Sequence, residues 1–95
     1  MSSMEYIKAA WTSGSPNEPC LMYYEIDESR QEVRKIELFS DGSAKLTSAD
    51  RNPSYLSERP LPEIEEINVD DQFSAEIVSA LEFENQWKRF DTSAG

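Results

Sequence analysis

The sequence contains no histidine, a single cysteine and only three glycines. Without histidine, the chain lacks the general base of Ser-His-Asp and Cys-His catalysis and the commonest zinc ligand. The glycines form neither G-x-G-x-x-G nor G-x-x-x-x-G-K-[ST], so the common nucleotide phosphate-binding motifs are absent. These absences predict a protein that is not an enzyme and holds no cofactor.

Cysteine occurs once, as Cys20, and this excludes an internal disulfide. Cys20 follows Pro19 at the start of a strand-like run and has no basic neighbour in the sequence to activate its thiol. We therefore expect a buried structural cysteine rather than a reactive one.

Basic residues are also few. The chain has nine Lys and Arg and 19 Asp and Glu, which gives a net charge of −10. This balance disfavours nucleic acid and anionic membranes as ligands, since both are bound mainly through Lys and Arg. It favours a basic protein as the partner, while the alternative that the charge serves only solubility stays open. The sequence leaves the oligomeric state undetermined.

Long apolar runs are absent, and none approaches the roughly 18 residues of a membrane-spanning helix. The first residues, MSSMEYIKAA, lack the basic and apolar regions of a signal peptide. We therefore expect a cytoplasmic protein.

Carboxylates are abundant, but their spacing does not match a metal or glycosidase site. The nearest calcium-loop register is Asn68-x-Asp70-x-Gln72, with Phe73 in place of the loop glycine and Ser79 in place of the bidentate glutamate. A glycosidase needs two acids across a sugar-sized cleft, which nothing in 95 residues marks. We predict no metal site and no catalytic residues.

The first half of the chain reads as four strands. Residues 6–11 alternate apolar and polar side chains, residues 21–26 are rich in β-formers, and residues 32–39 follow after a short polar segment. Asp41-Gly42 then supplies the positive φ angles of a tight hairpin turn before residues 43–48. These runs predict an antiparallel meander.

The second half predicts two helices around a fifth strand. A loop over residues 49–60 precedes a short helix that begins at Pro62 and ends near Asn68. Residues 73–78 alternate as a strand, and the S-x-x-E capping box at Ser79 opens the final helix. Its apolar positions recur at helical spacing, namely Ala80, Phe83, Trp87 and Phe90.

The order β-β-β-β-α-β-α predicts an α+β fold, in which a twisted antiparallel sheet of about five strands carries both helices on one face. The other face is expected to be polar and to include Lys8, Arg34 and Lys45. We predict one domain over residues 1–95, with about residues 1–4 and 91–95 frayed.

Negative charge is concentrated in the second half. Residues 1–57 hold nine acids and six bases, whereas residues 58–95 hold ten acids and three bases. From Pro60 to Glu76 there are six acids and no base. The candidate partner-binding residues are the five acids of PLPEIEEINVDD and a tyrosine in the preceding loop: Glu63, Glu65, Glu66, Asp70, Asp71 and Tyr55. The competing interpretation is a solvated face of a short helix, because acids in a first turn also suit the helix dipole.

Several stretches resemble a bacterial family of small acidic domains of unknown function. The similar motifs are EYIK with Trp11, LMYYEIDE, EVRKIELFSDG, PLPEIEEIN and a late helix containing Trp87. The resemblance implies a standalone α+β domain without known catalytic residues. Related domains resemble ones encoded beside bacterial toxins, which implies an immunity role.

The leading hypothesis is an immunity protein that binds a basic toxin domain, for example a nuclease, and covers its active site with an acidic surface. A nuclease cleft is positively charged because it holds phosphates, so carboxylates can occupy it. Two alternatives stay open. One is a phage-type inhibitor of a nucleic-acid-binding defence enzyme, and the other is a small carboxylate-based enzyme or metabolite-binding domain.

Overall fold

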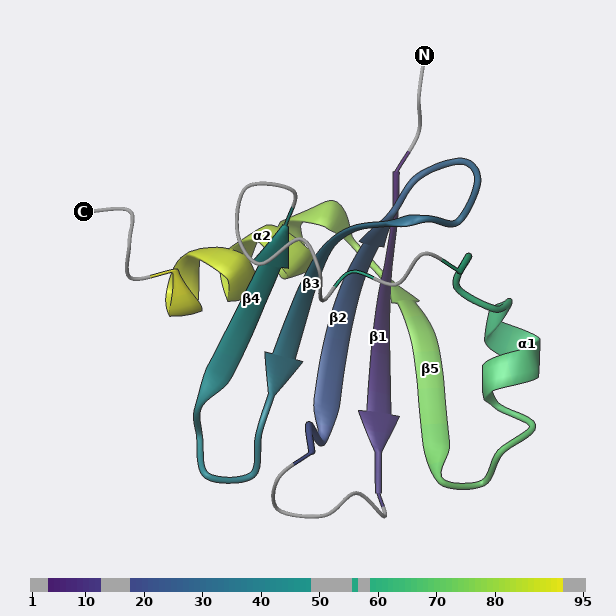
Figure 1. Cartoon of the computed structure of the whole chain (residues 1–95), viewed down its shortest axis with the longest axis horizontal. Helices are drawn as coiled ribbons and strands as arrows, with labels where there is room; N and C mark the ends of the chain where they lie inside the picture. The colour runs from purple at the N-terminus through teal and green to yellow at the C-terminus, as the bar shows by residue number, and fades with distance from the viewer. Residues whose placement is uncertain (1–3, 13–17, 49–55, 57–58, 92–95) are drawn as a thin grey trace.

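The computed structural model describes residues 4–12, 18–48, 56 and 59–91. Five strands form one open antiparallel sheet in the order β4-β3-β2-β1-β5, accompanied by two helices (Figure 1). The elements are β1 Glu5–Trp11, β2 Leu21–Ile26, β3 Glu32–Leu38, β4 Ala44–Ser48, α1 Ile64–Ile67, β5 Phe73–Val78 and α2 Ala80–Phe90. The predicted α+β class and element order are confirmed.

The sheet is a meander extended at one side. β1, β2, β3 and β4 pair with their sequence neighbours, and β5 pairs with the free side of β1. β4 and β5 are therefore opposite edges, and the chain passes from one edge to the other between them (Figure 1). In the part of the chain that the structure describes, no helix has the length and apolar character needed to cross a membrane.

The β3–β4 turn lies at Asp41-Gly42, where the sequence predicts it. The Phe39 amide donates to the Ser43 carbonyl at 2.9 Å, and Gly42 has a φ of 90°. Gly42 alone in this turn is left-handed, and Asp41 instead accepts bonds from the Ser43 amide and hydroxyl. Those bonds lower the pKa of the Asp41 carboxyl.

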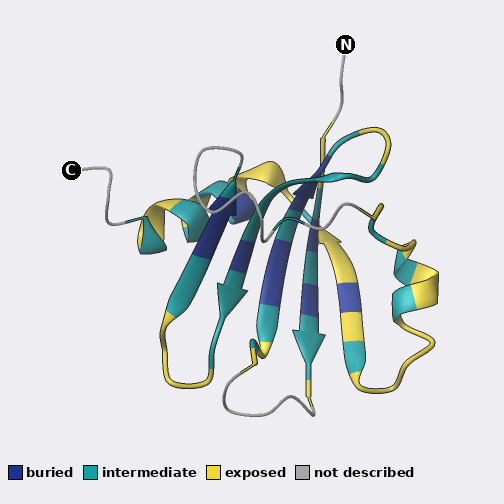
Figure 2. Ribbon diagram, in the orientation of Figure 1, coloured by how far each residue is buried: buried dark blue, intermediate teal, exposed yellow. Residues whose placement is uncertain are grey.

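The two helices pack against opposite faces of the sheet. On one face, Ile64 and Ile67 of α1 pack against a buried cluster of Ile7, Ala9, Met22, Ile26 and Ala75. On the other face, Phe83 of α2 joins Tyr23, Ile36 and Leu46. We call these the α1 face and the α2 face. In Figure 2 buried segments appear on all five strands and on α2, whereas α1 has none.

The expectation that both helices lie on one face is therefore wrong. The central strand β2 has apolar side chains on both sides, because Met22 belongs to the first cluster and Tyr23 to the second. A strand that is buried on both faces loses its polar–apolar alternation and needs a cover on each side.

Two further expectations are also corrected. Lys8, Arg34 and Lys45 do not share one helix-free polar face. Lys8 pairs in register with Tyr23 and Arg34 with Glu25, so both lie on the α2 face, whereas Lys45 lies on the α1 face. Cys20 is exposed rather than buried, because it precedes β2 at the rim of the sheet.

The helices differ in length and in how they begin. Ser79 is the N-cap of α2 and its hydroxyl accepts from the Glu82 amide at 3.1 Å, as the S-x-x-E motif predicts. Helix α1 has only four residues and begins two residues later than Pro62 predicted, after Glu63 without a side-chain cap. Helix α1 is too short to be stable alone, so its position depends on the packing of Ile64 and Ile67 against the sheet and on the bonds of its flanking residues.

Candidate functional site

The candidate site is the acidic segment, which we define as Pro60–Asp71. Within it, Ile64 and Ile67 face the sheet. Its acidic side chains are all exposed: Glu63, Glu65, Glu66, Asp70 and Asp71. The structure thus leaves all five predicted acids exposed to solvent, while Tyr55 lies outside the described residues.

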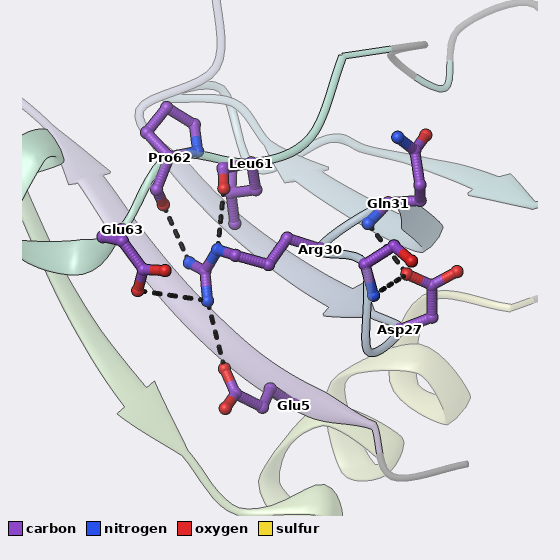
Figure 3. Close-up of polar contacts among 8 residues, drawn as sticks. Glu5, Asp27, Arg30, Gln31, Leu61, Pro62 and Glu63 are labelled. Atoms are coloured by element: carbon purple, nitrogen blue, oxygen red, sulfur yellow. Dashed lines mark hydrogen bonds and ion pairs between the residues drawn. The ribbon is translucent and has the colours of Figure 1, made fainter.

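Arg30, in the β2–β3 turn, anchors this segment (Figure 3). Its Nε donates to the Leu61 carbonyl and its Nη2 to the Pro62 carbonyl, each at 2.8 Å. In return, the Leu61 amide donates to the Arg30 carbonyl at 2.7 Å. Three hydrogen bonds therefore fix the start of the acidic segment to a turn that lies about 30 residues earlier.

The turn that carries Arg30 has an unusual backbone. Arg30 adopts a φ of 63°, in the left-handed region that side chains other than glycine rarely occupy. Asp27 builds the turn, because its Oδ1 accepts from the Ser29 and Gln31 amides at 2.9 Å each. The strained conformation points the Arg30 side chain toward the acidic segment (Figure 3).

One side of the segment borders a polar hollow of about 340 Å³. The guanidinium of Arg30 lies among carboxylates there, with its Nη1 3.4 Å from both Glu5 Oε2 and Glu63 Oε2 (Figure 3). The lining consists of this arginine and four acids, namely Glu5, Asp27, Glu28 and Glu63, which leaves a formal charge of −3. Among the described residues, no group of three carboxylate or thiolate side chains is placed to hold a metal ion.

The other side borders an apolar groove of about 290 Å³ on the α1 face. The sheet contributes Ala9, Met22, Tyr24 and Phe73 to its lining. The acidic segment supplies the rest, in which Leu61 and Ile67 are apolar and Glu66 and Asp70 bring carboxylates. The groove therefore combines an apolar surface with negative charge.

The predicted site residues divide between these two depressions. Glu63 lines the polar hollow, and Glu66 and Asp70 line the apolar groove. Glu65 and Asp71 line neither and are exposed to solvent. Asp70 also accepts from the Gln72 amide at 2.9 Å, so it helps to form the turn into β5.

Sequence reasoning missed the other residues of this surface. Glu5, Asp27, Glu28 and Arg30 lie at least 30 residues before the acidic segment and reach it only through the fold. No local pattern marks Arg30, because its role depends on a positive φ and on two distant carbonyl groups.

A second set of charged residues lies under α2, and we call it the Arg34 cluster: Tyr6, Glu25, Arg34 and Glu84. Arg34 donates to Glu25 through Nε at 2.6 Å and through Nη2 at 3.1 Å. It also binds Glu84, with Nη2 2.5 Å from Oε2. The guanidinium carbon lies 4.9 Å from the centre of the Phe83 ring and 5.0 Å from that of the Trp87 ring.

Burial and bonding set the titration of this cluster. Burial alone would raise the pKa of Glu25, which is 6 % exposed, but hydrogen bonds from Arg34 and Tyr6 outweigh it and lower that pKa. Burial, together with the bond from its hydroxyl to Glu25 at 2.8 Å, raises the pKa of Tyr6. Glu25 is therefore a charged, hydrogen-bonded group that ties β2 to β1 through Tyr6 and to β3 through Arg34, and Arg34 in turn binds Glu84 of α2.

Comparison with known proteins identifies a family but no activity. Residues 5–92 match a family model described as a domain of unknown function, DUF6881. Since the match covers most of the chain, the protein belongs to this family. No curated protein and no solved structure matches the chain.

Proposed function

We propose that this member of the family is a non-catalytic binding protein whose acidic segment covers a basic surface of a partner protein. One observation carries the proposal, namely that the segment exposes five carboxylates and turns its two isoleucines toward the sheet. Within the described residues, only Glu63 of these acids forms an ion pair. The remaining charge is directed to solvent, where it can attract and orient a basic partner.

The rigidity of the segment supports the same proposal. Carboxylates on a mobile tail would lose conformational freedom on binding, which reduces affinity. Here the Arg30 side chain holds the start of the segment, and Asn68 bonds the backbone of Ala75 on β5. The acids are therefore presented in a fixed arrangement before any partner arrives.

We further propose that the partner is a toxin and that this chain is its immunity protein. A nuclease toxin fits this surface best, because its cleft must be basic to hold phosphates and the carboxylates can take their place. The motifs EVRKIELFSDG and PLPEIEEIN, from whose resemblance an immunity role is expected, are in keeping with this proposal.

Co-expression tests this function. A toxin gene from the neighbourhood of this gene should stop growth when expressed alone and permit growth together with this protein. Reversing the charge of Glu65, Glu66, Asp70 and Asp71 to lysine should abolish that protection without loss of the folded protein. Full protection by this variant would contradict the assignment of the surface. Inhibition of a nucleic-acid-binding defence enzyme instead of a toxin would favour the phage-type inhibitor.

A further inference from the structure

We infer that the apolar groove receives an arginine side chain of the basic partner. This inference rests on the function proposed above and specifies the chemistry of one contact within it. The groove is bounded by the sheet on one side and by the acidic segment on the other, so a side chain entering it would touch both.

The lining of the groove favours a side chain with an apolar stem and a cationic head. Met22, Leu61 and Ile67 offer aliphatic surface for the stem. Glu66 and Asp70 supply carboxylates for the head, and no basic side chain is among the described residues that line the groove. A neutral apolar anchor would leave this charge unmatched.

Arginine fits the groove better than lysine. Its planar guanidinium stacks on aromatic rings, which Tyr24 and Phe73 provide, and it forms paired hydrogen bonds with carboxylates. The Tyr24 hydroxyl donates to Met22 Sδ at 3.1 Å, and its oxygen can still accept a hydrogen bond from a guanidinium. The ammonium of lysine is a more strongly hydrated point charge and gains less from the rings.

The size of the groove favours a side chain of a protein partner over a metabolite. Small-molecule pockets span about 300–1,000 Å³ and enclose most of their ligand. This groove, at about 290 Å³, lies at that lower limit. The polar hollow is the weaker candidate for the same cation, because Arg30 already lies among its carboxylates.

Blocked dipeptides test the inference without the partner. Acetyl-Leu-Arg-amide, acetyl-Leu-Lys-amide and acetyl-Leu-citrulline-amide would be titrated into the ¹⁵N-labelled full chain and followed by NMR. The arginine peptide should shift the amides of Ile67 and Phe73, and the indole N–H of Trp11, whose ring stacks on Phe73 at 5.4 Å. The indole of Trp87, on the α2 face, should not move.

The charge requirement gives the decisive comparison. The neutral citrulline peptide should bind about fivefold more weakly than the arginine peptide, as expected for two exposed ion pairs. Glu66→Gln combined with Asp70→Asn should lower the affinity for the arginine peptide by the same factor. These changes keep the shapes of both side chains, and the asparagine oxygen can still accept from the Gln72 amide.

Glu76→Gln is the control, because Glu76 is an exposed acid that pairs in register with Lys8 on the α2 face and does not line the groove. It should leave the affinity within about twofold of the unaltered protein. Equal binding of the citrulline or lysine peptide, or shifts centred outside the groove, would overturn the inference. If the peptide titration fails in this way but the fourfold charge reversal still abolishes protection, the proposed function stands and only the arginine site in the groove is rejected.

Discussion

The Arg34 cluster and the acidic segment use the same residue types for opposite purposes. In the cluster, Glu25 and Glu84 share one guanidinium beneath α2, and Glu25 is 6 % exposed. In the segment, Glu65, Glu66 and Asp71 are exposed and make no ion pair within the described residues. Burial and bonding, rather than residue type, therefore separate the charges that stabilise the fold from the charges available to a partner.

The largest effect is expected from Arg34→Met. It removes the partner of a buried carboxylate, so it should lower the free energy of unfolding by about 3 kcal/mol in urea denaturation. Adding Glu25→Gln should restore part of the loss, since the buried group is then neutral. A loss below about 1 kcal/mol would place the Arg34 cluster in the same class as a surface ion pair.

The pH dependence of the unfolding free energy tests the same cluster. Because the pKa of Glu25 is lowered by folding, its contribution to stability is present above its unfolded pKa of 4.5 and is lost as pH falls through the folded pKa. In Arg34→Met, burial should raise that pKa, so protonation of Glu25 then favours the folded state. Urea denaturation across this pH range, comparing each protein with its Glu25→Gln counterpart, isolates the contribution of Glu25 to the pH dependence of the unfolding free energy. This contribution should have opposite signs in the unaltered protein and in Arg34→Met. An unchanged sign would contradict the role assigned to Arg34.

Substitution of Arg30 should have the second-largest effect on stability, because Arg30 connects the β2–β3 turn to the start of the acidic segment. Arg30→Ala deletes the bonds to the Leu61 and Pro62 carbonyls and should lower the free energy of unfolding by about 2 kcal/mol. Arg30→Gly removes the same bonds but suits a φ of 63°, so it should recover about 1 kcal/mol. Equal losses in thermal denaturation would show that the left-handed backbone carries no strain.

Asn68 is an uncharged polar residue of the acidic segment whose side chain bonds the edge strand β5. Its side chain accepts from the Ala75 amide at 2.7 Å and donates to the Ala75 carbonyl at 3.2 Å, as a neighbouring strand would. Asn68→Ala should cost about 1 kcal/mol and speed hydrogen exchange of the Ala75 amide. Exchange as slow as in the unaltered protein would mean that another group protects this edge.

The smallest effect is expected from the exposed acids themselves. Asp71→Asn should change the free energy of unfolding by less than about 0.5 kcal/mol in either direction. Glu25→Gln alone, measured under the same conditions, is the contrasting change because it breaks a buried charged pair. Similar losses for both would remove the distinction between the two regions.

The fold was largely predictable because its signals are local. Alternation in β1 and β5, the Asp41-Gly42 turn and the Ser79 cap each depend on residues within a few positions. The placement of the helices was not predictable from the same signals, because β2 is apolar on both faces and reads as one continuous run. LMYYEI was itself the clue, since a single glutamate within such a run needs a buried partner.

The acids of the site were also predictable, because a base-free run is visible in the sequence. Their supporting contacts were not. The bonds from Arg30 to Leu61 and from Arg34 to Glu84 join residues 31 and 50 positions apart. Such pairs follow from the strand order and the helix packing, which the composition of either partner does not specify.

The most direct measurement compares two sets of charge changes against the purified partner. Glu65, Glu66, Asp70 and Asp71 would be neutralised to their amides in one variant. The matched variant would neutralise four acids elsewhere, Glu18, Glu37, Glu76 and Glu82, so that both variants gain the same net charge. Affinities would be measured by titration calorimetry at low and at physiological salt.

If the acidic segment is the recognition surface, the first variant should lose about 30-fold or more in affinity, as expected when several interfacial charge pairs are lost. The matched variant should lose about threefold or less, and raising the salt should narrow the difference between them. Equal losses in both variants would show that overall charge, and not this segment, attracts the partner. That result would contradict the central claim.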